Sequence, residues 1–152
     1  MRVVIDTNVL IDGVRDEMSP MYRIIEKCIE GKITPLMSSR IKREYTGKAS
    51  QLISDEGYFD VLEDFYDSAE EVWVTTRVRE SVDRQDNKFL EAAVDGEAAY
   101  VISSDADLTD LSEVRGVRIV TPAEFWNIYS DETGEESNEF ASWVQGMMGR
   151  SS

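Results

Sequence analysis

The sequence predicts an α/β fold built on a mostly parallel sheet. Short apolar runs alternate along the chain with amphipathic segments of helical period. Strands that alternate with helices are joined by right-handed β-α-β crossovers, which make neighbouring strands parallel. The 152 residues, of which 41% are hydrophobic, are enough for one domain with a buried core.

The first predicted strand is the β-branched run at residues 3–5, which is typical of a strand buried on both faces. The run stops at Asp6, and Thr7 and Asn8 begin the turn after it. In an open parallel sheet, ligands bind beyond the carboxyl ends of the strands. Asp6 is therefore a candidate site residue, and the alternative is that it only caps the following turn or helix.

The next elements can be placed from their periodicity and caps. Residues 10–17 are expected to form a short helical turn and a loop. Ser19 and Pro20 give a cap and a first helical position, and apolar residues at 21, 24, 25, 28 and 29 then mark one buried helix face that ends at Gly31. Cys28 lies on that face and is expected to pack in the core. Residues 32–37 are the second strand, and Ser38 or Ser39 caps a helix that runs through residue 45.

The second half continues the same alternation. A helix is expected over residues 58–70, a third strand over 72–74, a charged connector over 77–84 and a helix over 87–93. The fourth strand covers 100–104 and ends at Asp105. The fifth covers 117–120, and Thr121 and Pro122 then open a helix over 123–129.

The composition of the chain changes after residue 129. We expect the domain to span residues 1–129, an acidic linker to span 130–139, and a short amphipathic helix to span 140–152. That last helix either docks on its own domain, contacts a second copy, or binds a partner.

The residue types exclude several chemistries. The chain has no histidine and one cysteine, which excludes an internal disulfide, a His/Cys zinc site, a Ser-His-Asp triad and a Cys-His nucleophile. Chemistry must therefore use carboxylates, hydroxyls, Lys, Arg or a bound ion. No apolar run approaches the roughly 18 residues of a membrane span, and the first residues do not resemble a signal peptide, so a cytoplasmic location is expected.

The charge of the chain is strongly acidic, with 31 Asp and Glu against 16 Lys and Arg and a formal net charge of −15. Phosphate contacts need cations, so this balance opposes nucleic-acid binding. Clustered carboxylates that hold Mg²⁺ or Mn²⁺ would reverse the argument locally. The acid surplus could equally lie on faces away from the site.

Four acids fall at positions where the predicted fold could bring them together. Asp6 and Asp105 end strands, Asp86 opens a helix, and Glu44 lies in the helix after the second strand. Hard cations such as Mg²⁺ prefer oxygen ligands, and two such ions about 4 Å apart can serve a phosphodiester displacement. Taken singly, Asp86 could be a cap, Glu44 a solvated charge, and Asp105 with Asp107 a turn.

Cations lie close to two of these acids in the sequence. Arg40, Lys42, Arg43 and Lys48 surround Glu44, and Arg77, Arg79, Arg84 and Lys88 surround Asp86. Both groups could contact phosphates that flank a cut site. They could also be solvated charges that offset the nearby acids.

Taken together, these motifs resemble the PIN-domain nucleases, and in particular the toxins of toxin–antitoxin pairs (VapC-like). The resemblance runs from residue 3 to about 126. It rests on the segments at residues 4–10, 38–45, 86–93, 103–108 and 116–125. It implies a three-layer α/β/α fold with a mostly parallel five-stranded sheet of order 3-2-1-4-5. It also implies an endoribonuclease that depends on Mg²⁺ or Mn²⁺.

The resemblance also carries site residues and partners. The family's metal ligands, which are also its catalytic residues, map onto Asp6, Glu44, Asp86 and Asp105, with Asp107 as a weaker fifth acid. Thr7 and Asn8 resemble the supporting polar residues, and we add Arg43, Arg84 and Lys88 as candidate RNA contacts. Members of the family often form homodimers, and many are blocked by an antitoxin that occupies the acidic groove.

Two further classes compete with this interpretation. A non-catalytic module on the same fold would bind RNA or a protein partner without cleavage. A phosphatase or receiver domain also places an Asp at a strand end, but the second Asp two residues after Asp6 and the acidic pair that those classes use are missing here.

Overall fold

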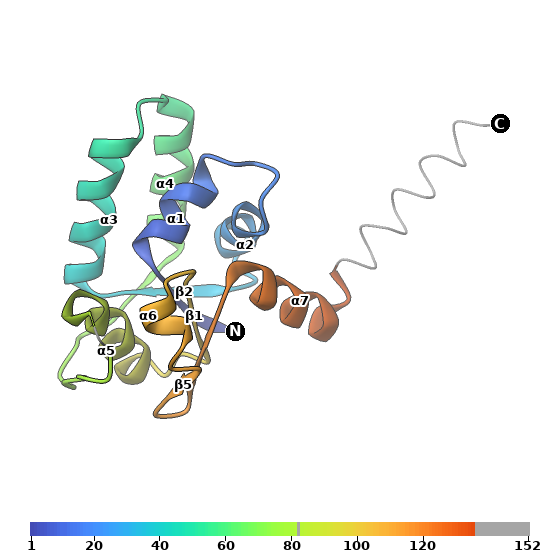
Figure 1. Cartoon of the computed structure of the whole chain (residues 1–152). Helices are drawn as coiled ribbons and strands as arrows, with labels where there is room; N and C mark the ends of the chain where they lie inside the picture. Colours follow the sequence, from blue (N-terminus) through green and yellow to red (C-terminus); the bar gives the residue numbers. More distant parts are fainter. Residues whose placement is uncertain (82, 136–152) are drawn as a thin grey trace.

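The computed structural model describes residues 1–81 and 83–135. It contains helices and strands in the alternation that the sequence predicts (Figure 1). The elements of the first half are β1 (Arg2–Ile5), α1 (Thr7–Val14), α2 (Pro20–Ile29), β2 (Thr34–Met37), α3 (Ser39–Leu52), α4 (Glu56–Ser68) and β3 (Glu70–Glu71). Those of the second half are the 3₁₀ turn η1 (Arg84–Asp86), α5 (Asn87–Asp95), β4 (Tyr100–Ile102), α6 (Ala106–Thr109), β5 (Glu113–Val114), β6 (Val117–Val120) and α7 (Pro122–Thr133).

One mixed sheet organises the domain, with the strand order β3-β2-β1-β4-β6-β5. The pairs β2–β3, β1–β2, β1–β4 and β4–β6 are parallel, and β5 runs antiparallel to β6. The α/β class and the mostly parallel sheet are therefore confirmed. The predicted order 3-2-1-4-5 corresponds to β3-β2-β1-β4-β6, and the predicted five strands are corrected to six by the short β5.

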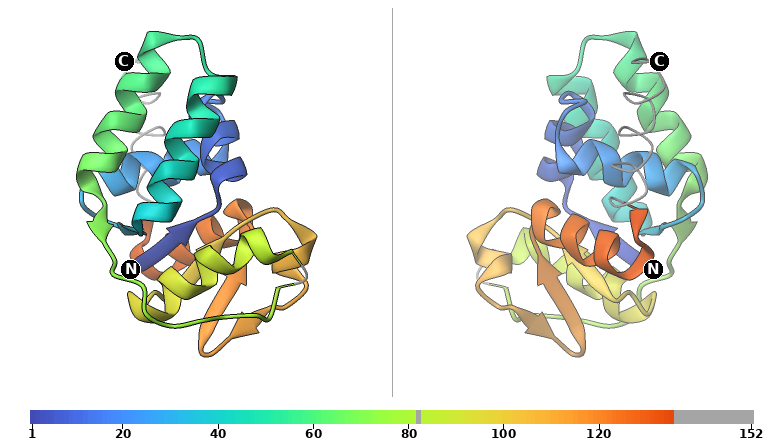
Figure 2. Two further views of the ribbon diagram at one scale, coloured as in Figure 1. Left: turned by 90° about the vertical axis from the view of Figure 1, so that its left-hand side faces the viewer. Right: turned by 90° about the vertical axis from the view of Figure 1, so that its right-hand side faces the viewer.

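Helices cover both faces of the sheet (Figure 2). Helix α5 lies across one face, where it contacts β1, β2, β4 and β6. Helices α2 and α7 contact each other and lie on the opposite face. Helices α3 and α4 extend beyond the sheet as a pair. This is the three-layer arrangement that the resemblance implies.

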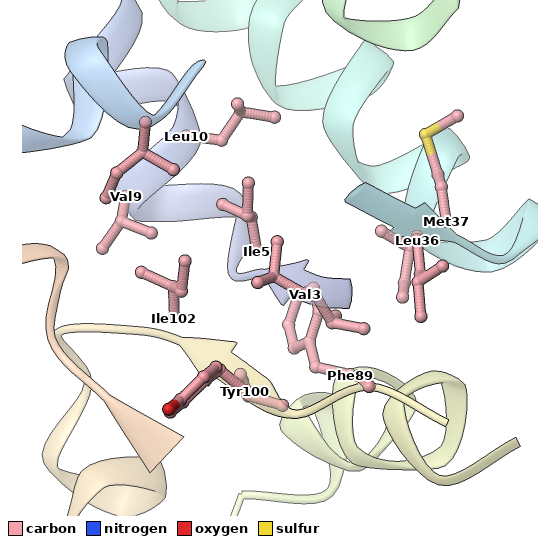
Figure 3. Close-up of a cluster of buried hydrophobic side chains, with 14 of the residues drawn as sticks. Val3, Ile5, Val9, Leu10, Leu36, Met37, Phe89, Tyr100 and Ile102 are labelled. Atoms are coloured by element: carbon pink, nitrogen blue, oxygen red, sulfur yellow. The ribbon is translucent and has the colours of Figure 1, made fainter. Parts of the chain in front are cut away.

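Buried side chains from β1, β2, β4, α1 and α5 pack together in the core (Figure 3). The run that the sequence analysis places at the centre, Val3 to Ile5, is almost completely buried. Ser19, Ser38 and Thr121 each accept a backbone N–H in the first turn of the following helix, as their positions predict. Cys28 is buried in the core. The local signals and the tertiary packing therefore agree over most of the chain.

The third strand is in a different place from the one predicted. The apolar triplet at residues 72–74 is not a strand, and the pairing with β2 falls on Glu70 and Glu71 instead. Val72 is buried, but the side chain of Trp73 is 83% exposed. The triplet therefore runs over the surface past the edge of the sheet, and its hydrophobic character does not reflect a paired strand.

Three helices also differ from their predicted extent. The segment expected to be a short turn is the two-turn helix α1, which begins directly after Asp6. The helix capped by Ser38 continues to Leu52, and the last helix continues to Thr133, so the first residues of the expected linker are helical. The rest of the expected linker beyond residue 135 and the expected helix at 140–152 lie outside the described residues. Within the described part, no helix is long and apolar enough to cross a membrane.

Candidate active site

Asp6 lies at the carboxyl end of β1, where the chain turns into α1. Its Oδ1 accepts the backbone N–H of Asn8 at 3.0 Å, so the capping role that the sequence left open is real. Its Oδ2 accepts the hydroxyl of Ser103 at 2.6 Å, across to the end of β4. The side chain is buried, and burial raises the pKa of Asp6 above its ordinary value although these two bonds lower it. The cap therefore holds a buried carboxylate in a fixed orientation.

Asp86 stands at the boundary of η1 and α5 and makes no capping hydrogen bond. The cap of this turn is Asp83, which accepts the N–H of Gln85 at 2.9 Å. Asp86 is buried, and its Oδ2 has no hydrogen-bond partner among the described residues. The alternative that Asp86 only caps a helix is therefore wrong, and its carboxylate is left for another role.

Asp105 follows β4 and completes this group. Its carboxylate caps α6 through the N–H of Asp107 at 2.9 Å, and its own N–H donates to the Ser103 hydroxyl at 3.0 Å. Ser103 thus links Asp105 to Asp6. Burial comes first among the causes that raise the pKa of Asp86 from 3.8 to about 7, followed by the adjacent carboxyl of Asp105 and the charge of Asp6. The carboxyl groups of Asp105 and Asp6 therefore lie close enough to Asp86 to change its pKa.

Glu44 projects from α3 toward the same edge of the sheet. Its Oε2 accepts the hydroxyl of Thr7, and its Oε1 lies 2.9 Å from the ammonium of Lys88. Lys88 is itself buried and also donates to the carbonyl of Gln85 at 2.6 Å. Glu44 is therefore held in place between α1 and α5 and is not a freely solvated charge.

A second set of carboxylates was missed in part by the sequence analysis. One oxygen each from Asp83, Asp86 and Asp107 lies within 4.8 Å of the others. Asp107 was expected here, whereas Asp83 was not singled out. Its signal was available, because a spacing of three residues places Asp83 and Asp86 on the same side of a helical turn.

A groove of about 580 Å³ opens from Asp6 and Asp105. Its lining follows α1 toward the start of α2, and residues at the start of α7 line its other side. Two further acids on and after α1, Asp12 and Asp16, line it, and the sequence analysis did not anticipate them. The other lining residues are Asn8, Val9, Gly13, Ser19, Pro20, Met21, Ser104, Thr121, Pro122 and Ala123.

The predicted cations divide between two places. Arg43 and Lys88 lie with Glu44, Arg40 and Gln85 around a small pocket of about 300 Å³. Arg84 does not line this pocket but a neighbouring one. Thr7 is buried against Glu44, whereas Asn8 is exposed and lines the groove.

The donor set fits a hard divalent cation. All the candidate ligands are carboxylates, which are the oxygen donors that Mg²⁺ and Mn²⁺ prefer. The buried and unpartnered Oδ2 of Asp86 is an orphaned acceptor of the kind that a bound ion would satisfy. A raised pKa is also expected where several carboxylates share a site without their cation.

Comparisons with known proteins agree with this geometry. A sequence model of the PIN domain matches residues 2–107, which is more than two thirds of the chain. A search of the curated proteins gave no match. Among solved structures, a chain in the crystal structure of VapBC2 from Rickettsia felis, bound to a DNA fragment from their promoter, aligns with a TM-score of 0.55 and 12% identity. The alignment covers 78% of this chain and 97% of that one, so the two share a fold.

Proposed function

Because this chain belongs to the PIN domain family, we propose that it is an endoribonuclease that depends on Mg²⁺ or Mn²⁺ and acts as the toxin of a toxin–antitoxin pair. The observation that carries the proposal is the buried Oδ2 of Asp86, which has no partner among the described residues and lies in a group with Asp105 and Asp6. A buried acceptor without a donor is destabilising, so its retention is best explained by a ligand.

The chain's carboxylates have distinct parts in this proposal. Asp6, Asp86 and Asp105 hold the ion, and Glu44 and Asp107 complete its surroundings. A divalent cation bound there would supply a Lewis acid and the positive charge that an RNA phosphate needs. Asp86 must first lose the proton that it keeps up to a pH of about 7.

The remaining residues orient this group. Ser103 fixes the carboxylate of Asp6, and Thr7 with Lys88 fixes that of Glu44. Lys88 also offsets part of the negative charge beside the site, which lowers the cost of bringing a phosphate there. We propose that Arg43, Arg84, Lys88 and Asn8 contact the RNA.

The acidic groove suits a protein partner better than a polyanion. Asp12 and Asp16 add carboxylates to those of Asp6 and Asp105 along its length, with apolar surface between them. Such a groove fits a segment with basic and apolar side chains. We propose that an antitoxin protein occupies it and blocks access to the metal site, as the VapBC2 relative is named for a two-protein system. We also propose that the enzyme is a homodimer and that it acts in the cytoplasm.

The test is cleavage of a labelled single-stranded RNA with Mn²⁺, for the wild type, Asp6→Asn and the control Asp60→Asn. Asp60 is an exposed acid on α4, so the control makes the same charge change away from the site. We expect Asp6→Asn to lose more than about a hundredfold in rate, because even partners outside a metal's ligand shell account for roughly 10- to 100-fold. Wild-type cleavage that persists in EDTA, or an active Asp6→Asn, would overturn the proposal. Metal binding without cleavage of any RNA would favour the non-catalytic module.

A further inference from the structure

A second concave feature shares no residue with the acidic groove. It is a pocket of about 610 Å³ between the start of α3, the segment before η1, and α5. Its lining includes Arg40, Arg77, Arg79 and Arg84, and we call it the arginine pocket. Residues 77–81, which carry two of these arginines, run beside α5 in Figure 2, and Arg84 lies in η1 at the start of α5.

No carboxylate of the described residues pairs with any of the four guanidinium groups. Within residues 1–81 and 83–135, none of them lies within 4.0 Å of a carboxylate oxygen. Glu91 is the single acid among the described residues that line the pocket. In a chain of net charge −15, such a local excess of unpaired arginine marks a binding surface for an anion.

A buried hydroxyl adds an independent observation. Ser81 lines the arginine pocket, its side chain is only 6% exposed, and its Oγ has no hydrogen-bond partner among the described residues. The backbone N–H of Ser81 donates to the Asn87 side chain at 3.0 Å, which fixes this residue against α5. A phosphate oxygen bound beside the guanidinium groups would give this buried donor an acceptor.

An exposed aromatic ring adjoins the arginine pocket. Trp73 is 83% exposed and lines a hollow of about 320 Å³ that shares Arg40, Arg77 and Glu91 with the arginine pocket. The chain beside it is held firmly, since the backbone N–H groups of residues 75 and 76 donate to Asp95 at 2.7 and 2.9 Å. An indole ring presented next to arginines is the combination that binds single-stranded nucleic acid, through stacking and phosphate contacts.

The arginine pocket is continuous with the candidate active site. Arg40 lines both this pocket and the smaller pocket around Glu44 and Lys88. Arg84 precedes Asp86 by two residues in the same 3₁₀ turn. A strand that occupied the arginine pocket would therefore be close to the carboxylates.

We propose that the arginine pocket and Trp73 anchor a single-stranded stretch of the RNA outside the cleavage site. A phosphate of the strand lies among the arginines and accepts the Ser81 hydroxyl, and an adjacent unpaired base stacks on the indole. This anchor rests on the proposed function, because it takes RNA as the ligand. Duplex RNA is disfavoured, since its bases are already stacked on one another.

The experiment measures binding without cleavage. Fluorescence anisotropy of a labelled single-stranded RNA in EDTA compares the wild type with Arg77→Gln/Arg79→Gln. The control is Arg23→Gln/Arg118→Gln, which removes two exposed arginines that do not line the arginine pocket. We expect at least tenfold weaker binding for the first double variant and less than twofold for the control. The slope of log affinity against log salt should also become shallower by about 0.7 for each RNA phosphate that is no longer neutralised by an arginine.

Two further arms define the ligand. Trp73→Ala should weaken binding roughly tenfold, in the range of one stacked base, and leave the salt slope unchanged. The affinities of the wild type and of Arg77→Gln/Arg79→Gln are also compared for RNA with a 5′-phosphate and RNA with a 5′-hydroxyl. If only the wild type prefers the 5′-phosphate, the bound phosphate is the terminal one. If neither of these two proteins has a preference, the bound phosphate is internal. Equal RNA binding by the wild type and Arg77→Gln/Arg79→Gln would overturn the anchor.

The anchor and the proposed function can fail separately. If the wild type binds RNA through these arginines but cleaves none with Mn²⁺, the anchor stands and the nuclease proposal fails. If the wild type cleaves and Arg77→Gln/Arg79→Gln binds and cleaves equally well, the nuclease stands and the anchor is wrong. Neither arginine forms an ion pair within the described residues, so thermal unfolding of the double variant should be unchanged.

Discussion

The affinity of this protein for Mn²⁺ should depend strongly on pH, because Asp86 must lose a proton to bind the ion. Its pKa is raised to about 7 by burial and by the neighbouring acids. About one tenth of such a group is ionised at pH 6 and about nine tenths at pH 8. We therefore expect the dissociation constant to fall about tenfold between these values, which corresponds to about 1.4 kcal/mol.

Isothermal titration calorimetry tests this expectation directly. Titrations of Mn²⁺ at pH 6 and 8, in two buffers of different ionisation enthalpy, give both the affinity and the number of protons released. At pH 6 we expect release of about 0.9 proton per ion from Asp86. Asp6, whose pKa is also raised by burial, should add to the release at lower pH. Asp86→Asn should remove most of the affinity, and Asp60→Asn should retain the full pH dependence.

The same proton affects the stability of the metal-free protein. In the unfolded chain the carboxyl ionises near 3.8, whereas in the folded protein it keeps its proton up to about 7. The folded state therefore binds more protons in this window, so the contribution of Asp86 to the free energy of unfolding falls as pH rises from about 4 to about 7.

A dissociation constant for Mn²⁺ that changed less than twofold between pH 6 and 8, with no proton release, would refute the reasoning.

Three further substitutions test the supports of the site. Ser103→Ala removes the donor to Asp6, so we expect Mn²⁺ to bind about tenfold more weakly by calorimetry, and unchanged binding would show that this bond does not matter. Tyr45→Phe removes a buried bond to the carbonyl of Ile5 and should lower the free energy of unfolding in urea by about 1–2 kcal/mol without changing Mn²⁺ affinity. Gly13→Ala would press a methyl group into the facing methionine of α2, so the free energy of unfolding in urea should fall by about 1–3 kcal/mol. An unaltered midpoint would mean that α1 and α2 can move apart to make room for the methyl group without cost.

Buried strands and capped helices could be predicted because each has a local signal. The β-branched run before Asp6 is hydrophobic on both faces, as a central parallel strand requires, and it is the centre of the sheet. Ser19 and Pro20 start α2 where the sequence places it, because a capping hydroxyl and a fixed proline φ are local properties. Such elements can be predicted without knowledge of the tertiary structure, and the structure confirms both of them.

The two short edge strands could not be located in this way. The hairpin of β5 and β6 turns at Arg115 and Gly116, both with positive φ. Arginine is not among the residues that predict a turn of this kind, which are Asn, Asp and Gly. Strand β3 pairs through two exposed glutamates, while the apolar Trp73 beside it is exposed. Strand pairing does not explain the exposure of Trp73. Its exposed ring lies beside arginines on the surface of the folded protein.

The candidate site could be predicted in outline but not in its internal bonds. The carboxyl ends of β1 and β4 bring Asp6 and Asp105 to one edge because parallel neighbours end together. Sequence spacing could not show that Ser103 links them, or that Asp83 takes the capping role and leaves Asp86 free. Those contacts depend on side chains that meet only in the folded protein.

The location of bound Mn²⁺ tests the central claim most directly. Anomalous diffraction from crystals of the wild type soaked in MnCl₂ would place the ion among the acids. We predict a peak within about 2.2 Å of a carboxylate oxygen of Asp86, with a second ligand from Asp6 or Asp105. A peak held only by Asp83 and Asp107, or no peak at these acids at millimolar Mn²⁺, would contradict the account.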